Sequence, residues 1–330
     1  MSKGSVLVTG AAGFVGRHVV KILYEKGYHI KAGIHKVENS FFDKTNIESI
    51  NINILEPGSI MRAMKGVESV YHFAAMVDTK ESKERLYEIN VEGTKNVWQC
   101  AADCGVRKAL YCSSAAVYGL LGKSHQVLTE QVRARAVEPY GYSKLSGENE
   151  VLKIAAKSNL NTIIIRPVAI FGPGEHTPFG KKLREAAVSK LLIAGGFQNK
   201  RFNYVHVEDV AEAAVYLMEN HSLSGEVFNV CVNESILFEE AFQAYIRVLK
   251  RAGSSYLTIR LLALISVLLH KVPDVLHWML NNFGEGFVFK IWHPGFDLNY
   301  SSQKLLQRSF KFKWNNFEDV FYSCLDESTL

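Results

Sequence analysis

The 330-residue chain has few of the residues that cross-link or interrupt a fold, with five cysteines and seven prolines. The cysteines are odd in number and include no CxxC pair, so we expect reduced thiols and no metal site. Hydrophobic residues make up 48% of the chain and charged residues 22%, both close to the globular average. Because a chain of this length can bury a large core without cross-links, the composition excludes disordered, collagen-like and disulfide-dependent proteins.

Concentrated basic charge is also missing. Lysine and arginine number 38 against 33 aspartates and glutamates, which gives a net charge of +5. The densest basic groups, at 181–184 and 247–251, lie in segments with helical spacing and are typical of solvent-exposed helix faces. A nucleic-acid-binding surface needs a concentrated basic stripe, so we expect no nucleic-acid partner.

No apolar run has the ~20 residues that a transmembrane helix needs. The nearest candidate, Leu261–Leu269, is bounded by Arg260 and His270. The first β-rich run begins at Ser5, which leaves no room for a signal peptide before it. We therefore expect a cytoplasmic protein.

Short β-rich runs alternate with helical patterns through the first two thirds of the sequence. Strands that alternate with helices predict an α/β protein with a doubly wound parallel sheet covered on both faces. The expected strands are Ser5–Val8, His29–Ile34, Ser69–Phe73, Ala109–Cys112, Thr162–Ile165 and Val227–Val230, and the expected helices are Phe14–Lys26, Asn90–Cys104 and Leu145–Lys157.

After about residue 232 the strand patterns fade, and helical patterns with large apolar residues dominate. Residues 174–201 also lack a strand pattern and interrupt the alternation. We therefore expect two units. Residues 1–173 and 202–231 form the sheet domain, and residues 174–201 with 232–330 form a smaller, mostly helical substrate lobe.

The segment Tyr256–Leu280 in this lobe has a broad apolar face at helical spacing. Pro273 is expected to end its first helix, because proline cannot continue the hydrogen-bond ladder. Three interpretations stay open: a lid over a pocket for an apolar substrate, the core of the lobe, or a helix resting on a membrane surface.

A glycine-rich motif, Thr9–Gly16 (TGAAGFVG), lies between the first expected strand and the first expected helix. Gly10, Gly13 and Gly16 permit a tight turn and a close backbone approach to a pyrophosphate. The amino terminus of the following helix adds N–H donors and a dipole that favours phosphate. In this strand–turn–helix context the motif predicts a dinucleotide site.

The end of the second expected strand selects between NAD and NADP. An acidic residue there accepts hydrogen bonds from the free ribose 2′-hydroxyl of NAD. The sequence instead has His35 and Lys36, and Glu38 comes two to three residues late. A basic pair suits a 2′-phosphate, so we expect NADP, with NAD as the alternative if the pair faces solvent.

A tyrosine and a lysine in the segment PYGYSK are candidates for proton transfer. Tyr140 and Lys144 are four residues apart, so a helix places them on one face. Tyrosine is a poor base at neutral pH, but a neighbouring ammonium group lowers its pKa. The same tyrosine can donate a proton to a carbonyl oxygen. Ser113–Gly119 (SSAAVYG) follows an expected strand, where a hydroxyl can polarise that oxygen.

Together these motifs resemble those of the extended short-chain dehydrogenase/reductase superfamily. The resemblance covers residues 5–231, and residues 232–330 match loosely. The matching segments follow the family's order: Thr9–Gly16 is similar to its TGxxGxxG loop, Tyr71–Ala75 to its HxAA turn, Asn90–Thr94 to NVxGT, Ser113–Gly119 to SSxxVYG, Tyr140–Lys144 to YxxxK, Arg166–Gly174 to RPxxxYGPG and Tyr204–Ala211 to VHVxDVA.

The resemblance implies a Rossmann domain and an NAD(P)-dependent oxidoreductase of the extended short-chain type. Tyr140 would be the acid/base, Lys144 would hold the nicotinamide ribose, and Ser114 would bind the substrate oxygen, with Ser113 as its competitor. Val117, Tyr140 and Phe202 complete the expected substrate contacts. The expected cofactor contacts are Thr9, Gly10, Gly13, Phe14, Val15, Gly16, His35, Lys36, Asn53, Ile54, Leu55, Phe73, Ala74, Ala75, Asn90, Tyr140, Lys144, Pro167 and Val168.

Two branches of the superfamily compete. Enzymes similar to 3β-hydroxysteroid dehydrogenases and dihydroflavonol reductases transfer a hydride between NAD(P) and a secondary alcohol or ketone on an apolar molecule. Nucleotide-sugar epimerases and dehydratases use tightly held NAD and grip a diphosphate with two arginines. PYGYSK is epimerase-like, but Arg201 stands one position early for the first arginine and residues 293–297 read HPGFD at the second. We therefore expect the first branch and a largely apolar small-molecule substrate. The alternatives are an epimerase and a non-catalytic NAD(P)-binding sensor, and a homodimer is possible in either case.

Overall fold

The protein is built around a seven-stranded parallel sheet. A computed structural model describes residues 3–35, 42, 47–77, 81–119, 127–174, 191–195, 201–220, 223–251, 257–261 and 298–325. The strand order is β11-β6-β5-β4-β1-β2-β3, and every neighbouring pair is parallel. The strands are β1 (Lys3–Thr9), β2 (Tyr28–Ile34), β3 (Glu48–Asn51), β4 (Ser69–His72), β5 (Lys108–Cys112), β6 (Asn161–Pro167) and β11 (Glu226–Val230).

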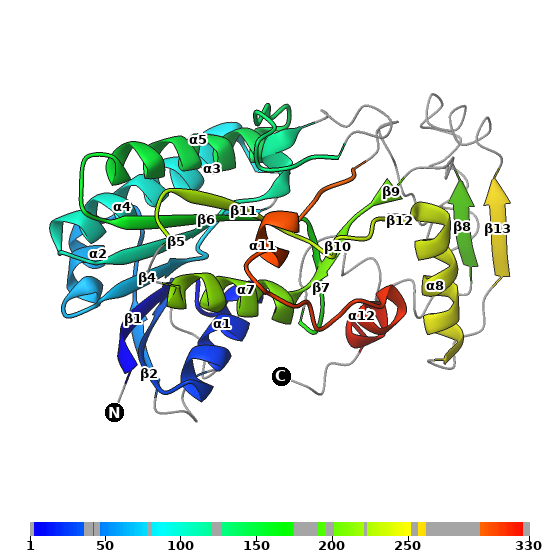
Figure 1. Cartoon of the computed structure of the whole chain (residues 1–330), viewed down its shortest axis with the longest axis horizontal. Coiled ribbons are helices and arrows are strands. Elements are labelled where there is room, and N and C mark those ends of the chain that lie inside the picture. Colours follow the sequence, from blue (N-terminus) through cyan, green and yellow to red (C-terminus); the bar gives the residue numbers. More distant parts are fainter. Residues whose placement is uncertain are drawn as a thin grey trace.

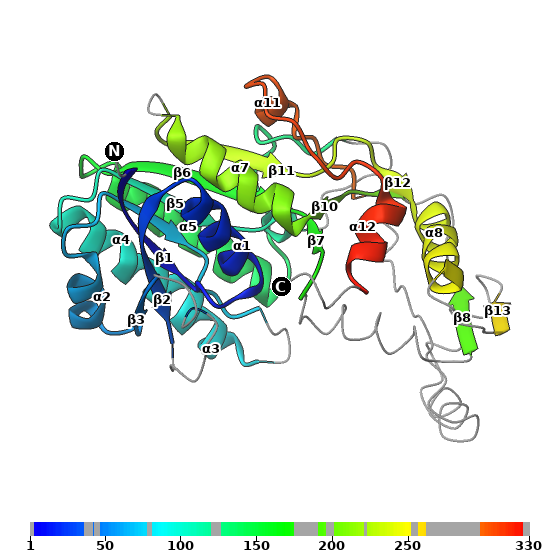
Figure 2. The same cartoon turned by 90° about the horizontal axis from the view of Figure 1, so that it is seen from below.

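Helices cover both faces of this sheet, which confirms the predicted doubly wound architecture (Figures 1 and 2). In the part of the chain that the structure describes, no helix is long and apolar enough to cross a membrane. One layer contains α1 (Phe14–Glu25) and α7 (Val207–Glu219), and the other contains α2 (Pro57–Met64), α3 (Lys83–Tyr87), a π-helical turn at Glu88–Gly93, α4 (Thr94–Asp103) and α5 (Pro139–Ala155).

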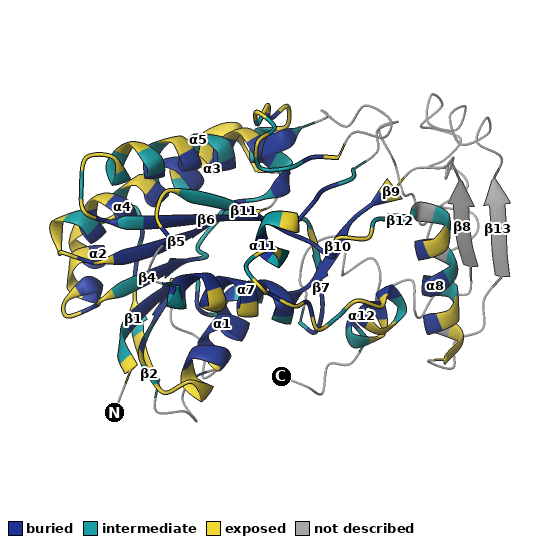
Figure 3. Ribbon diagram, viewed as in Figure 1, coloured by how far each residue is buried: buried dark blue, intermediate teal, exposed yellow. Residues whose placement is uncertain are grey.

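Burial on both faces explains why the central strands are nearly continuous apolar runs. Val6, Leu7 and Val8 of β1 are at most 1% exposed, and Ile163–Ile165 of β6 are completely buried. In Figure 3 the central strands are dark blue, whereas the outer helix faces carry the exposed residues. The carboxyl edge of this rigid sheet therefore provides a fixed platform for a site.

A second, smaller hydrophobic core lies beside the carboxyl edge. It includes the buried rings of Phe171, Phe202, Tyr204, Phe317 and Phe321. Its elements are β7 (Ala169–Phe171) paired in parallel with β10 (Tyr204–His206), β9 (Arg201–Phe202) paired antiparallel with β12 (Ile236–Leu237), and the helices α8 (Phe238–Arg251) and α12 (Phe317–Ser323).

Two expectations for this region are wrong. Residues 174–201 contain a strand, β8 (Leu191–Gly195), and it pairs in parallel with β13 (Leu257–Leu261) at the start of the segment expected to be helical. The apolar residues of LTIRL alternate, and a short run of this kind cannot be assigned to helix or strand by periodicity alone. The rest of Tyr256–Leu280, including Pro273, lies outside the described residues.

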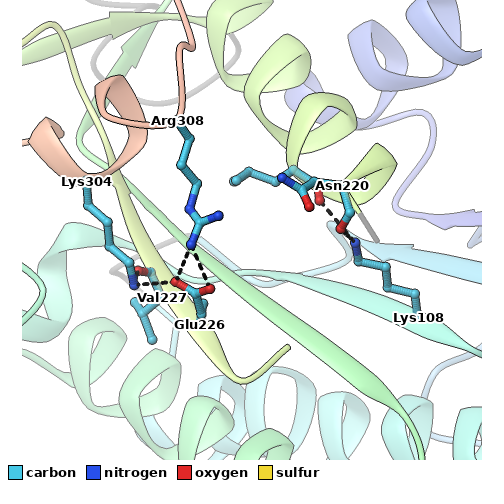
Figure 4. Close-up of polar contacts among 7 residues, drawn as sticks. Lys108, Asn220, Glu226, Val227, Lys304 and Arg308 are labelled. Carbon is cyan, nitrogen blue, oxygen red and sulfur yellow. Dashed lines mark hydrogen bonds and ion pairs between the residues drawn. The ribbon is translucent and has the colours of Figure 1, made fainter. Parts of the chain in front are cut away.

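The chain then returns from the lobe to the sheet. Leu305 lies in the short helix α11 (Gln303–Leu306). Together with Phe310 and Phe312, it belongs to the core around α1 and α7. Lys304 Nζ donates to the Val227 carbonyl at 2.8 Å, and Arg308 pairs with Glu226 at 3.0 Å (Figure 4). Residues 303–312, which the sequence assigned to the lobe, therefore pack against the sheet. The division into two units remains a prediction.

Candidate active site

The glycine motif forms a tight turn at the carboxyl end of β1. Gly10 has a φ of +68°, and a Cβ there would lie 2.6 Å from the Ala74 nitrogen, so only glycine fits. A Cβ on Gly16 would overlap the Gly10 carbonyl oxygen. The first turn of α1 has neither an acidic residue nor a side-chain cap, which leaves its N–H groups available. This bare backbone fits the pyrophosphate of a dinucleotide.

A buried hydrogen-bonded histidine fixes the neighbouring strand end. His72 Nδ1 lies 2.6 Å from Thr9 Oγ1, and His72 Nε2 lies 3.0 Å from Thr94 Oγ1. Burial, followed by the positive charge of Lys144, lowers the pKa of His72 to about 3. His72 is therefore neutral at physiological pH, and it ties β1, β4 and the start of α4 together just before the predicted contacts Phe73, Ala74 and Ala75.

Asn90 lies in the π-helical turn and anchors both sides of the site. Its amide accepts from the Met76 nitrogen at 2.8 Å and donates to the Met76 oxygen at 2.9 Å. It also donates to Ser143 Oγ at 2.9 Å, and Ser143 in turn donates to the Tyr140 carbonyl. Asn90 thus holds the loop after β4 against α5, and its expected contact with the cofactor stays a prediction.

Tyr140 lies in the first turn of α5, which begins at Pro139, a residue suited to the first helical position. Burial raises its pKa, Cys112 raises it further, and hydrogen bonding from the Ser114 hydroxyl lowers it. Desolvation is the largest of these influences. The lowering of this pKa expected from Lys144 stays a prediction. Tyr140 is held as a protonated phenol beside Ser114.

Lys144 lies one turn further along the same face of α5 and is only 2% exposed. Its Nζ is 4.4 Å from the centre of the Tyr111 ring, and within the described residues it donates no hydrogen bond. Burial lowers its pKa to about 8, while Cys112 and Glu148 oppose that shift. An ammonium group with three free donors fits the hydroxyls of a cofactor ribose.

The next turn of the same face of α5 is bound to the sheet by a buried ion pair. Glu148 accepts from Arg166 Nε at 2.9 Å and from Arg166 Nη2 at 2.6 Å. Arg166 Nη1 donates to the Tyr118 hydroxyl at 2.9 Å, which donates to Asn229 Oδ1 at 2.8 Å. This chain of contacts connects α5, β6, β11 and the turn that begins with Ser114.

The predicted adenosine contacts are less clearly placed. His35 is exposed at the end of β2, and Lys36 lies outside the described residues. The Asn53 amide is engaged in its own turn, where it accepts from the Leu55 nitrogen at 3.1 Å and donates to Glu56 at 2.8 Å. The preference for NADP therefore stays a prediction.

The predicted substrate contacts also differ in their placement. Val117 is fully buried, and Phe202 is 9% exposed with its ring 5.8 Å from that of Phe317. Both side chains contribute to packing, and their contact with a substrate stays a prediction. Among the described residues the buried Ser113 hydroxyl has no hydrogen-bond partner, whereas Ser114 is half-buried beside Tyr140.

Sequence reasoning gave no role in the site to Cys112, Glu148, Arg166 or His72. Cys112 is the residue before the SSxxVYG motif, and its pKa is raised to about 11 by burial. It is therefore a protonated thiol in the wall of the site. The sequence did contain one indication that Glu148 lies near the site, because it continues the four-residue spacing of Tyr140 and Lys144.

The parallel sheet, the glycine turn and the Tyr140–Lys144 helix define a class of protein, the extended short-chain dehydrogenase/reductase superfamily. Within that class, the chain belongs to the NAD dependent epimerase/dehydratase family, whose sequence profile matches residues 6–231. This match confirms the resemblance drawn from the motifs.

Comparison with individual proteins supports the same family. A 3-beta-hydroxysteroid dehydrogenase from Mycolicibacterium neoaurum is 27% identical, over 72% of this chain and 68% of the relative. A dihydroflavonol 4-reductase from Callistephus chinensis is 24% identical, over 98% of this chain and 86% of the relative. The solved structure of UDP-glucose 4-epimerase from Thermotoga maritima has a TM-score of 0.77 at 19% identity, over 98% of each chain, which shows the shared fold. The matches cover between 42% and 68% of the lengths of four curated relatives.

Proposed function

We propose that the protein is an oxidoreductase that transfers a hydride between NAD(P) and a secondary alcohol or ketone on a largely apolar small molecule. The observation that carries this proposal is the convergence of Ser114, Tyr140 and Lys144 at the carboxyl edge of the sheet. A hydroxyl, a half-buried phenol and a free ammonium on one surface are the groups that carbonyl reduction requires.

Each residue has a defined task in the proposed reaction. Ser114 donates a hydrogen bond to the substrate oxygen, and Tyr140 gives that oxygen a proton as the carbonyl becomes an alcohol. In the reverse direction Tyr140 accepts the proton. Lys144 binds the ribose and, as a cation on the same helix face, favours the tyrosinate that forms. The bound nicotinamide supplies or accepts the hydride.

Two observations support an apolar substrate. The curated relatives include enzymes named for a hydroxysteroid and a dihydroflavonol. Arg201, the nearest arginine to the place where a diphosphate would be gripped, donates instead to the Ser235 carbonyl at 2.8 Å. A small-molecule substrate of sterol-like or polyphenol-like character therefore fits better than a nucleotide sugar.

The test is turnover with defined substrates. The purified protein is incubated with a 3β-hydroxysteroid and NAD or NADP, with a dihydroflavonol and NADPH, and with UDP-glucose and NAD. We expect net reduction or oxidation of the cofactor with one of the apolar substrates, and none with Tyr140→Phe. Conversion of UDP-glucose to its epimer without net cofactor consumption would instead establish the epimerase alternative. Cofactor binding without turnover of any of these substrates would favour a sensor.

A further inference from the structure

Two opposite charges are buried one helical turn apart on α5. Lys144 is 2% exposed and Glu148 is also 2% exposed. On a helix, a lysine and a glutamate four residues apart are neighbours and normally form an ion pair. Burial strengthens such a pair, because little water screens the charges. The expected partner of Lys144 is therefore Glu148.

The structure has a different pairing. Both Glu148 oxygens accept from Arg166, at 2.9 and 2.6 Å, in the two-pronged geometry that a planar guanidinium group matches best. Lys144 Nζ faces the Tyr111 ring and, within the described residues, donates to no oxygen. Arg166 thus occupies the carboxylate that would otherwise bind the ammonium.

We propose that Arg166 is a positioning residue that holds Glu148 away from Lys144, so that the Lys144 ammonium stays free for the cofactor. The inference rests on the proposed function, because it takes Lys144 to be a cofactor-binding residue. Without Arg166, Glu148 is a buried carboxylate with no partner, and the nearest cation on its own helix is Lys144. An intrahelical pair would then compete directly with the ribose hydroxyls.

The guanidinium group is itself held in place. Its third contact, to the Tyr118 hydroxyl at 2.9 Å, is fixed by the bond from Tyr118 to Asn229. Tyr118 ends the short helix at Ala115–Tyr118 that Ser114 caps. Arg166 therefore cannot swing away from Glu148 without losing contact with the turn that carries the proposed substrate hydroxyl.

The test measures binding of the reduced cofactor by fluorescence at pH 6.5, where Lys144 is charged. We expect Arg166→Met to weaken binding roughly 10- to 100-fold, the loss of about one hydrogen-bonded charge. Glu148→Gln removes the competing carboxylate, so it should bind within about threefold of the wild type. The decisive variant is the double substitution Arg166→Met/Glu148→Gln, which should recover most of the lost affinity.

Recovery separates this role from a structural one, because a double variant that has lost the whole ion pair cannot regain a structural contribution of Arg166. A folded double variant that binds as weakly as Arg166→Met would overturn the proposal. So would unchanged binding by Arg166→Met. If Arg166→Met does not fold, the comparison of Glu148→Gln and the double variant with the wild type still decides the matter, since both must bind well.

A Lys144→Met variant separates failure of this inference from failure of the proposed function. If Lys144→Met binds the cofactor normally, Lys144 is not a cofactor-binding residue and the proposed function loses its support there. If Lys144→Met binds weakly and Arg166→Met does not, only the positioning role is wrong. In the Lys144→Met background, Arg166→Met should cause no further loss of cofactor affinity.

The pH dependence of binding gives a second readout. The ionisable groups around Lys144 are Tyr140 and Glu148, each four residues away on α5, Tyr111 and Cys112 on β5, and His72 on β4. Of these, Glu148 is a carboxylate whose charge raises the pKa of Lys144. The alkaline loss of cofactor affinity should therefore begin at lower pH in Glu148→Gln than in the wild type. An unchanged profile would show that the Glu148 carboxylate does not act on Lys144.

Discussion

Two lysines are buried at opposite edges of the sheet, and their ammonium groups differ in the hydrogen-bond partners they have. Lys108, at the amino end of β5, is 6% exposed, and Lys144, at the carboxyl edge, is 2% exposed. Burial lowers the pKa of each from 10.5 to about 8. The two ammonium groups thus carry a similar desolvation cost, and they differ in their partners.

Lys108 is saturated with partners. Its Nζ donates to the carbonyls of Leu217 and Met218 at 3.1 and 3.0 Å. It also donates to the Asn220 carbonyl, as Figure 4 shows. These are carbonyls at the end of α7, where a helix lacks internal donors and favours a cation. Lys108 therefore caps a helix, whereas Lys144 donates no hydrogen bond within the described residues.

The polar groups around the two lysines differ in the same way. A cavity of about 660 Å³ lies at the amino edge and is lined by Lys108 and by charges that are already paired. Glu219 receives hydrogen bonds from Lys3, Lys26 and Tyr28, and Arg107 pairs with Glu68. Unsatisfied polar groups, rather than cavity size, therefore distinguish the candidate active site.

The largest expected effect concerns the carboxyl edge. Tyr140→Phe removes one hydroxyl and leaves the ring, so turnover should fall roughly 10²- to 10⁴-fold, as for loss of a general acid. Cofactor affinity should change little. The check is steady-state kinetics with a substrate found by the panel above. Tyr142, which is 55% exposed, is the matched control, and Tyr142→Phe should keep full activity. Near-normal turnover by Tyr140→Phe would show that Tyr140 is not the general acid.

The next effect separates the two lysines directly. Lys144→Met should weaken cofactor binding roughly 10- to 100-fold and raise thermal stability, because it removes a buried charge that has no hydrogen-bond partner among the described residues. Lys108→Met should leave cofactor binding unchanged and destabilise the protein by about 2 kcal/mol, because helix carbonyls lose their donor. Fluorescence titration and thermal unfolding measure the two quantities. Parallel behaviour of the two variants would refute the comparison.

The sequence predicted the sheet well because its strands are apolar runs bounded by turn residues. It did not reveal β3, whose residues ESIN form a short, mostly exposed edge strand. It misassigned β13, because LTIRL fits both periodicities. Strands β8 and β13 depend on pairing across 66 positions, from Leu191 to Leu257, which local spacing cannot encode.

The candidate site divides in the same way. The tight turn at Gly10 and the placement of Tyr140 and Lys144 on one helix face were predictable, because both depend on local spacing. The contacts that set their environment come from distant positions: Thr9 meets His72, 63 residues away, and Arg166 meets Glu148, 18 residues away. The periodicity of a sequence does not predict such long-range contacts. The desolvation of Tyr140 likewise depends on all of the elements that surround it.

A third effect is the pH dependence of stability. Each lysine has a folded pKa near 8, below its unfolded value, so between pH 8 and 10.5 the unfolded chain binds more protons and stability rises with pH. Below pH 8 the cost of each buried charge is fully present. Relative to Lys144→Met, the wild type should gain about 1 to 2 kcal/mol between pH 7.5 and 9.5.

The control for that measurement is Lys108→Met. Relative to Lys108→Met, the wild type should gain the same amount, about 1 to 2 kcal/mol, between pH 7.5 and 9.5. At pH 7, however, Lys108→Met lowers stability whereas Lys144→Met raises it. Denaturant unfolding at each pH gives both numbers. A flat difference for either variant would show that the corresponding lysine does not titrate in this window.

A smaller effect is expected at the carboxyl end of β2. His35→Asp places an acid where the ribose 2′-oxygen of the cofactor is read, and it should repel a 2′-phosphate and accept from a 2′-hydroxyl. The ratio of kcat/KM for NADP to that for NAD should fall by about 10-fold, the scale of one modest polar contact. A ratio that already favours NAD in the wild type would contradict the predicted NADP preference.

The smallest effect returns to the amino edge, at Glu219. Its carboxylate holds Lys3, Lys26 and Tyr28, and these contacts lower its pKa despite partial burial. The two lysine partners are 45% and 36% exposed, so water and salt screen most of the attraction. Glu219→Gln should therefore cost less than about 1 kcal/mol of stability, and the loss should shrink in high salt. Thermal unfolding at low and high ionic strength measures both. A larger, salt-independent loss would mean that this edge, like the Lys144 site, depends on a buried charge.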